Sequence, residues 1–199
     1  MSVSPERFAQ GLTYDDFKNR LTKNRERYLA NEQQVPLEPE DSTFFQGLGR
    51  PVHVLVLAEE WCGDVIGNLP ILGRIAEVSG WLDLRIFLRD ENADLMDQYL
   101  NEGKYRSIPV FVFLDEQFHE IGRFVERSAA ATERRVRFQE ELRARYPGYS
   151  GPGAAIAELP EDVRASIQQE MAEKRLEWAE VDARDTVRSI RAILARAVA

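Results

Sequence analysis

Runs of apolar residues in the middle of the chain predict four β-strands. Residues 52–58 are β-branched and almost entirely apolar, which is typical of a central strand buried on both faces. Residues 81–88 alternate between apolar and polar before turning apolar, and residues 110–114 form a third apolar run. A polar turn at residues 115–117 then leads into a fourth strand at residues 119–126.

Apolar residues at helical spacing predict the segments between these strands. A charged helix is expected to begin at Thr13, a suitable N-cap, and to run to about Gln33. Further helices are expected around Phe44 to Leu48, from Gly63 to Val78 with Gly80 ending it, from Asp90 through Leu100, and from Ser128 to Tyr146.

The order of these elements predicts the fold class. A helical crossover between early strands implies parallel pairing, whereas a tight turn between the last two strands implies antiparallel pairing. We therefore expect an α/β fold with a mixed four-stranded sheet and helices on both faces. The helix at residues 128–146 is expected to close this unit.

The last part of the chain carries two apolar stripes. A Gly/Pro-rich linker is predicted at residues 147–153, followed by a highly charged helical stretch at residues 158–199. One straight helix cannot bury both stripes against one surface, because they lie about half a turn apart. Either the helix breaks near residues 182–185 and folds back on its own domain, or it lies between two partners, as in a homodimer. The first stripe is Val163, Ile167, Met171, Trp178 and Val181, and the second is Val187, Ile190, Leu194 and Val198.

Composition narrows the class of protein. The 199 residues carry a formal net charge of −8 without a block rich in Lys or Arg, which argues against nucleic acid and anionic lipid as partners. Residues 1–12 lack the apolar segment of a signal peptide, and the apolar run at 52–58 is too short to span a bilayer. A single cysteine forms no internal disulfide and suits a reducing compartment. We expect a soluble cytoplasmic protein.

The candidate chemistry centres on Trp61-Cys62-Gly63-Asp64-Val65, which follows a buried strand and opens a helix. Unpaired N–H groups at a helix N-terminus stabilise an anion, and a thiolate is such an anion. Pro70 lies inside the same helix, where it should produce a kink. Ser107-Ile108-Pro109 directly precedes a strand, an unusual place for a proline.

These residues resemble the thioredoxin family. The Trp-Cys-Gly motif is similar to that family's active-site motif, Pro70 to its kink proline, and Ile108-Pro109 to its cis-proline. The resemblance covers residues 51–146 and implies a thioredoxin-like core, with helical extensions at residues 1–50 and 147–199. It implies that Cys62 is the catalytic nucleophile. The residues it implies for substrate binding are Trp61, Gly63, Asp64, Ile108, Pro109 and Gly122.

Two departures from the family pattern change the expected chemistry. The family's second cysteine falls on Val65, and the buried acid beneath the motif falls on Val56. Dithiol chemistry is therefore excluded for the isolated chain. We expect a monothiol redox protein that needs no cofactor and acts on a disulfide-containing protein or a low-molecular-weight thiol. An external thiol, for example glutathione, would resolve the mixed disulfide.

A binding or scaffold module is the alternative, in which Cys62 is incidental and the groove or the C-terminal helices bind another protein. Glu59, Glu60 and Asp64 flank the thiol and should oppose the helix dipole, so the sequence leaves the net effect on its pKa open. Asp64 is equally explained as an acid favoured at a helix start. His53 and His119 have no second ligand nearby in the sequence, and no metal site is expected.

Overall fold

The computed structural model describes residues 3–151 and 154–196, whose contacts form two compact units. Unit 1 contains the described residues up to Ser128 together with those from Ala183 onward, and unit 2 contains Ala129–Asp182. The chain therefore leaves unit 1 after the last strand and returns to it with its final helix. The three-part division implied by the resemblance, into residues 1–50, 51–146 and 147–199, stays a prediction beside this grouping.

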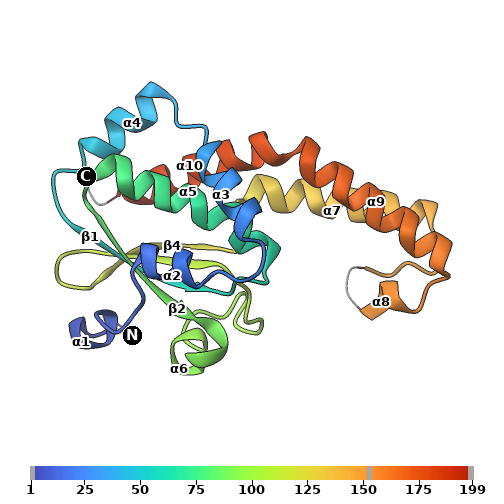
Figure 1. Ribbon diagram of the computed structural model, residues 1–199, viewed down its shortest axis with the longest axis horizontal. Helices are drawn as coiled ribbons and strands as arrows, with labels where there is room; N and C mark the ends of the chain where they lie inside the picture. The colour runs from blue at the N-terminus through green and yellow to red at the C-terminus, as the bar shows by residue number, and fades with distance from the viewer. Residues whose placement is uncertain (1–2, 152–153, 197–199) are drawn as a thin grey trace. The chain divides into compact units, whose positions relative to one another are not determined.

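The centre of unit 1 is a four-stranded mixed sheet in the order β2-β1-β3-β4 (Figure 1). β1 pairs with β2 in parallel and with β3 antiparallel, and β3 pairs with β4 antiparallel. In the register, Val54 of β1 lies between Leu84 and Phe113. These pairings confirm the predicted mixed sheet. The strands are β1 (Val52–Ala58), β2 (Leu82–Leu88), β3 (Val110–Leu114) and β4 (Glu120–Val125).

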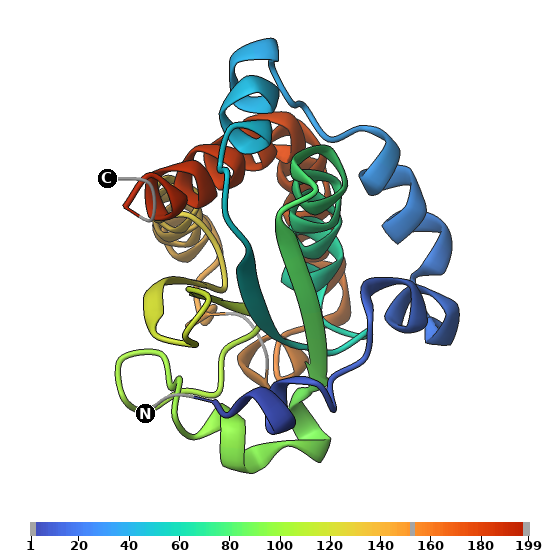
Figure 2. The same ribbon diagram turned by 90° about the vertical axis from the view of Figure 1, so that its left-hand side faces the viewer.

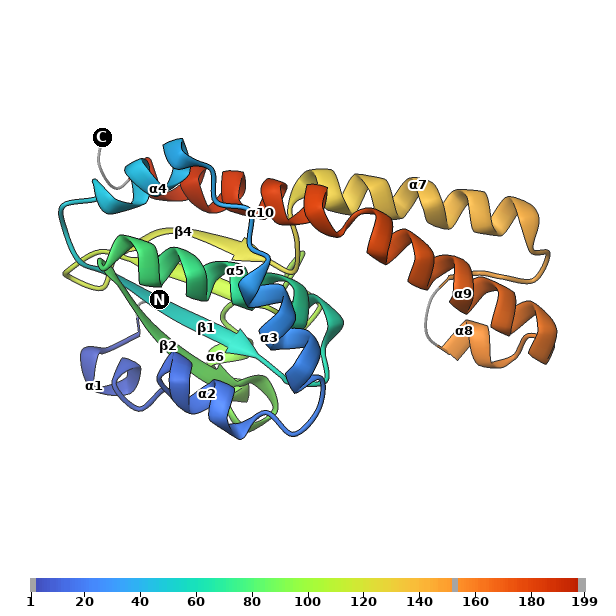
Figure 3. The ribbon, with the colours of Figure 1, turned by 45° about the horizontal axis from the view of Figure 1, so that its top comes forward.

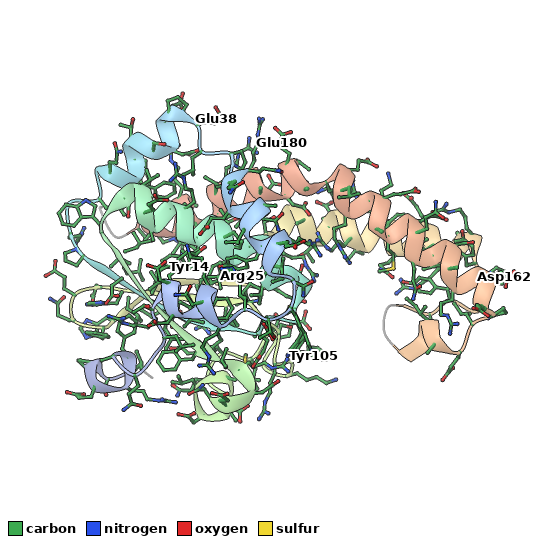
Figure 4. All side chains as sticks on the ribbon, in the orientation of Figure 1. Tyr14, Arg25, Glu38, Tyr105, Asp162 and Glu180 are labelled. Atoms are coloured by element: carbon green, nitrogen blue, oxygen red, sulfur yellow. The ribbon has the colours of Figure 1, made fainter. Side chains whose placement is uncertain are left out.

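Helices cover both faces of this sheet, as predicted. α4, α5 and the unit 1 part of α10 lie over one face, and α1 and α6 lie over the other (Figures 2 and 3). Tyr14 of α2, labelled in Figure 4, packs its ring directly on Gly73 of α5, where a Cβ atom would clash with it. The helices are α1 (Pro5–Phe8), α2 (Tyr14–Arg20), α3 (Arg25–Gln33), α4 (Pro39–Gln46), α5 (Gly63–Ser79), α6 (Ala93–Met96) and α10 (Ala179–Leu194).

Two predicted helices are shorter than their patterns indicated. The helix expected over 13–33 is split into α2 and α3, because Asn24 adopts a left-handed conformation (φ 57°). The carboxylate of Glu60 accepts the N–H of Thr22 at 2.6 Å, which holds the connecting loop. The helix expected after Asp90 is a 3₁₀ turn, Arg89–Glu91, followed by α6. Asn92, whose backbone is neither helical nor extended (φ −131°, ψ 55°), separates the two.

The helix that completes the core of unit 1 differs from the prediction. α7 (Ala129–Arg145), expected to close the sheet, belongs to unit 2 by its contacts. The second apolar stripe does this instead: Val187, Ile190 and Leu194 of α10 are buried in the same cluster as the strands. The reason is apolar content, because α7 buries three side chains in a strongly charged sequence whereas α10 has a continuous stripe. Val198 of that stripe lies outside the described residues.

Unit 2 is built from α7, α8 (Ala154–Ala157) and α9 (Glu161–Glu177). The first stripe packs here around Ile167, and Trp178 meets Phe138 edge-on with 5.7 Å between ring centroids. Val181, the last member of the stripe, is partly exposed. The two stripes thus belong to separate cores, and the chain turns at Trp178 rather than at 182–185. None of the helices described is long and apolar enough to span a bilayer.

Candidate functional site

Cys62 occupies the N-cap position of α5, four residues after β1 ends. Its side chain is half-buried, and its thiol donates to the carbonyl oxygen of Ile108 at a sulfur–oxygen distance of 3.4 Å. The peptide bond between Ile108 and Pro109 is cis. The structure therefore brings together three of the predicted residues, from segments 46 positions apart in the sequence.

Trp61 and Gly63 form the exposed side of this site. The Trp61 side chain is 48% exposed, and the guanidinium carbon of Arg89 lies 4.8 Å from its ring centroid. Apart from its chain neighbours and the backbone of its own helix, no described heavy atom lies within 4 Å of the position that a Gly63 Cβ would take, so a side chain there would have open space. Tyr105, labelled in Figure 4, is half-exposed in the segment leading to Ile108.

Gly122, also predicted to bind substrate, lies elsewhere. It pairs with Phe113 in the register of β3 and β4, three residues from the end of β4. A Cβ atom at this position would approach the side chain of Ile193 at 3.0 Å. Gly122 therefore permits the close approach of α10 to the sheet, and the structure does not bring it to Cys62.

Asp64 is part of an ionic cluster that the sequence did not reveal. Its carboxylate accepts from the Arg127 guanidinium at 2.5 Å, and the Glu126 carboxylate accepts from the same guanidinium nitrogen at 3.0 Å. Arg127 and Glu126 follow β4 directly. Nothing in their spacing links them to the motif, because the turn after β4 is positioned by tertiary contacts.

The environment of Cys62 raises the pKa of its thiol. Burial is the largest cause, and the negative charges of Asp64 and Glu126 act in the same direction. Hydrogen bonds from the N–H groups of Val65 and Asp64 lower the pKa without reversing the shift. The sequence left the direction of the shift in the thiol pKa open. In the structure, the hydrogen bonds at the start of α5 do not outweigh burial and negative charge, so the pKa is raised.

The carboxylates of the other two acids that flank the thiol, Glu59 and Glu60, accept hydrogen bonds from residues other than Cys62. The buried carboxylate of Glu59 accepts the N–H of Asp90 at 2.9 Å, and burial raises the pKa of Glu59. Glu60 holds the loop between α2 and α3. These residues therefore position the segments around the site. In the part of the chain that the structure describes, no three or more His, Cys, Asp or Glu side chains are grouped to hold a metal ion.

Asn68 is a buried residue of α5 whose side chain makes three hydrogen bonds. Its amide nitrogen donates to the backbone carbonyls of Asp64 and Glu126, at 3.0 and 3.2 Å. Its amide oxygen accepts from the hydroxyl of Thr186 on α10 at 2.8 Å. One side chain thus joins α5, the turn after β4 and α10. A lone Asn inside the apolar segment 65–69 is the feature of the sequence that could have identified it.

Pro70 leaves one carbonyl of α5 without its helical donor, because proline has no N–H and its partner four residues earlier is Ile66. The side-chain amide of Asn31 on α3 supplies the missing donor and lies 2.7 Å from that carbonyl oxygen. Helix α3 therefore contacts the proline-containing segment of α5 directly through this hydrogen bond.

Replacing Asn31 with alanine should lower the free energy of unfolding by about 1–2 kcal/mol, because it leaves the Ile66 carbonyl unpaired. Urea denaturation followed by circular dichroism measures this change. Glu26→Ala, at an exposed position of the same helix, is the matched control and should have less than about 0.5 kcal/mol of effect. Equal effects of the two variants would contradict this role for Asn31.

Comparisons with known proteins place this geometry in a family. A family model described as "Thioredoxin" matches residues 11–142. The crystal structure of PA1234, a protein of unknown function from Pseudomonas aeruginosa, is similar over 97% of this chain and 98% of its own, with 22% identity and a TM-score of 0.68. An HIV epitope-scaffold structure is similar over the same shares, with 20% identity and a TM-score of 0.67.

At these identities the structural likeness shows the fold alone. No curated protein matches the sequence. The family model, however, covers more than half of the chain and includes Cys62, Pro70 and Pro109. The protein therefore belongs to the thioredoxin family.

Proposed function

We propose that this protein is a monothiol thiol–disulfide redox protein acting through Cys62. The observation that supports this most directly is the placement of the thiol. It is partly exposed at the start of α5, within 3.4 Å of the Ile108 carbonyl oxygen and next to Pro109. Trp61 and the backbone at Ile108 flank the side from which a disulfide would approach.

The reaction has two exchange steps. The Cys62 thiol loses its proton to solvent, and the thiolate attacks one sulfur of a disulfide. The disulfide bond breaks, a new bond joins Cys62 to the attacked sulfur, and the other sulfur leaves as a thiolate. Val65, fully buried where the family has its second cysteine, cannot resolve this product. An external thiol, such as glutathione, then attacks the attached sulfur, and Cys62 leaves as a thiolate.

The substrate class is a disulfide-containing protein or a low-molecular-weight thiol in its oxidised form. A reducing cytoplasm is the proposed location, because external thiols are abundant there. The chain's formal charge of −8 makes nucleic acid and anionic lipid poor partners. Self-association through the C-terminal helices stays a prediction, although the stripe of Val187, Ile190 and Leu194 is already buried within unit 1.

Native protein incubated with oxidised glutathione should form one mixed disulfide, and Cys62→Ser should form none. The rate should keep rising as the pH passes the ordinary titration range of a thiol, because the pKa of Cys62 is raised and the thiolate is the attacking form. Mass spectrometry of samples quenched with acid measures both results. The same chain unfolded in urea is the control for thiol accessibility. A native chain that stays unmodified while the unfolded chain reacts would contradict the redox function.

The raised thiol pKa itself favours a second candidate, a binding module whose thiol is largely uncharged at neutral pH. In that case the exposed surface around Trp61 binds a protein segment without covalent chemistry. The two functions differ in what Cys62→Ser does: it abolishes the redox function and leaves noncovalent binding intact. Trp61→Ala, at the exposed edge of the site, should weaken both.

A further inference from the structure

Arg127 is a permanent cation paired with Asp64, which lies two residues after Cys62. Its side chain is 21% exposed, and one guanidinium nitrogen donates to both Asp64 and Glu126. Burial alone would lower the pKa of Arg127, but the hydrogen bond and charge of Asp64, together with Glu126 and Cys62, raise it. The guanidinium therefore keeps its charge over the whole range in which a thiol titrates.

The backbone that carries Arg127 is fixed to the elements that form the thiol site. Glu126 has a left-handed conformation (φ 63°), which is uncommon for a residue other than glycine. Its N–H donates to the carbonyl of Pro109 at 2.7 Å, and its own carbonyl accepts from Asn68 of α5. These contacts hold the turn in an unfavourable conformation that directs Arg127 to Asp64, and backbone strain of this kind is concentrated at functional sites.

Part of the Arg127 guanidinium is not used by the fold. Its Nε atom is buried and has no hydrogen-bond partner among the described residues. An unpaired buried donor costs stability, so a residue present only to stabilise the turn would be better replaced by a smaller one. The charge of Arg127 is thus retained at a structural cost.

We propose that Arg127 is a positioning residue that supplies the positive charge for the Cys62 thiolate, and that Asp64 withholds this charge in the resting protein by pairing with it. This inference rests on the proposed function and states which residues control the reactivity of the Cys62 thiol. Among the described residues, the charged and polar groups that act on the thiol include the Asp64 carboxylate and the N–H groups of Asp64 and Val65 from α5. They also include the Ile108 carbonyl and, after β4, Glu126 and Arg127.

Replacing Asp64 and replacing Arg127 should change the reactivity of the Cys62 thiol in opposite directions. In Asp64→Asn, Arg127 loses one of its two carboxylate partners and the thiol loses a neighbouring negative charge. Alkylation of Cys62 by iodoacetamide at neutral pH should therefore become about tenfold faster. In Arg127→Gln the rate should fall by about the same factor, because Asp64 and Glu126 then act unopposed. The double variant should lie between these values, and Arg127→Lys, which keeps the charge, should restore most of the rate.

The thiolate absorbance of the full-length chain against pH, with Cys62→Ser as the baseline, gives an independent reading, since Cys62 is the only cysteine. Arg74→Gln and Glu77→Gln are the matched controls, because they remove an exposed ion pair from the same helix. They should leave both measurements unchanged.

Unchanged titration of Cys62 in a folded Asp64→Asn variant would overturn the inference, and so would equal shifts in the same direction for Asp64→Asn and Arg127→Gln. The effect of the Arg127 charge is given by the difference between Asp64→Asn and the double variant, because Asp64→Asn alone also removes a negative charge from beside the thiol. A double variant that reacts as fast as Asp64→Asn would show that Arg127 does not act on the thiol. Neither alkylation nor absorbance uses a disulfide substrate. Failure to form a mixed disulfide would therefore reject the proposed function and leave this result standing.

Discussion

Replacing Asn68 with alanine is expected to destabilise unit 1 by about 3 kcal/mol, because it leaves buried partners without their hydrogen bonds. The Glu126 carbonyl loses the hydrogen bond from the Asn68 amide, and the buried hydroxyl of Thr186 loses its hydrogen bond to the Asn68 amide oxygen. A small cavity adds to the cost, since Asn68 lies within the buried face of α5. Urea denaturation followed by circular dichroism measures the change in the free energy of unfolding.

Variants at Thr186 distinguish the contribution of the Asn68–Thr186 hydrogen bond to stability from the contribution of side-chain packing. Thr186→Val keeps the shape and removes the hydroxyl, and it should cost about 1–2 kcal/mol, whereas Thr186→Ser should retain most of the stability. Asn68→Ala combined with Thr186→Val should cost less than the sum of the single changes, because both remove the same bond. Additive losses, or a loss below about 1 kcal/mol for Asn68→Ala, would show that the bonds are not coupled.

Replacing Ile190 with aspartate is expected to destabilise unit 1 by more than about 4 kcal/mol. Ile190 is fully buried in the cluster that contains the central strands. A carboxylate there loses its hydration and removes apolar contacts at the same time. Thermal and urea unfolding should show an earlier transition or none, and binding of a hydrophobic dye should increase.

Arg188→Ala is the matched control, two residues away on the exposed side of the same helix, and should change stability by less than about 0.5 kcal/mol. If α10 were only an appendage, both variants would unfold like the original chain. Such a result would mean that the stripe of Val187, Ile190 and Leu194 does not belong to the core of unit 1.

The strands could be predicted from the sequence because each carries its own pattern. The apolar run at 52–58 and the alternation at 81–88 differ from every helical segment, and the polar turn at 115–117 defines the hairpin. The start of α5 and its end at Gly80, in the left-handed conformation, could likewise be located from local features.

The helices were less predictable because their sequences are charged and their boundaries depend on distant contacts. The break at Asn24 is held by Glu60, 36 residues further along the chain. The choice of α10 over α7 as the closing helix depends on which stripe fits the sheet beside Gly122. The two stripes themselves were sufficient to predict two separate buried surfaces, but the position of the turn was wrong by several residues.

The candidate site was only partly predictable for the same reason. Cys62, Ile108 and Pro109 could be named from the motif and from the proline before a strand, and the structure brings them together. Arg127 and Asn68 carry no such local feature. Their roles arise from one salt bridge and two side-chain hydrogen bonds that join distant segments.

The interrupted sequence of unit 1 sets a condition on the order of folding. The sheet and α5 are synthesised early, but Ile190 and the Thr186 hydroxyl reach them only after all of Ala129–Asp182 has been made. Such distant contacts close slowly, because a long loop must be ordered first. During translation, the face of β3 and β4 that α10 covers in the folded protein therefore stays partly exposed until α10 has been made. A nascent chain stalled before residue 183 would be a natural client for chaperones that bind apolar surfaces.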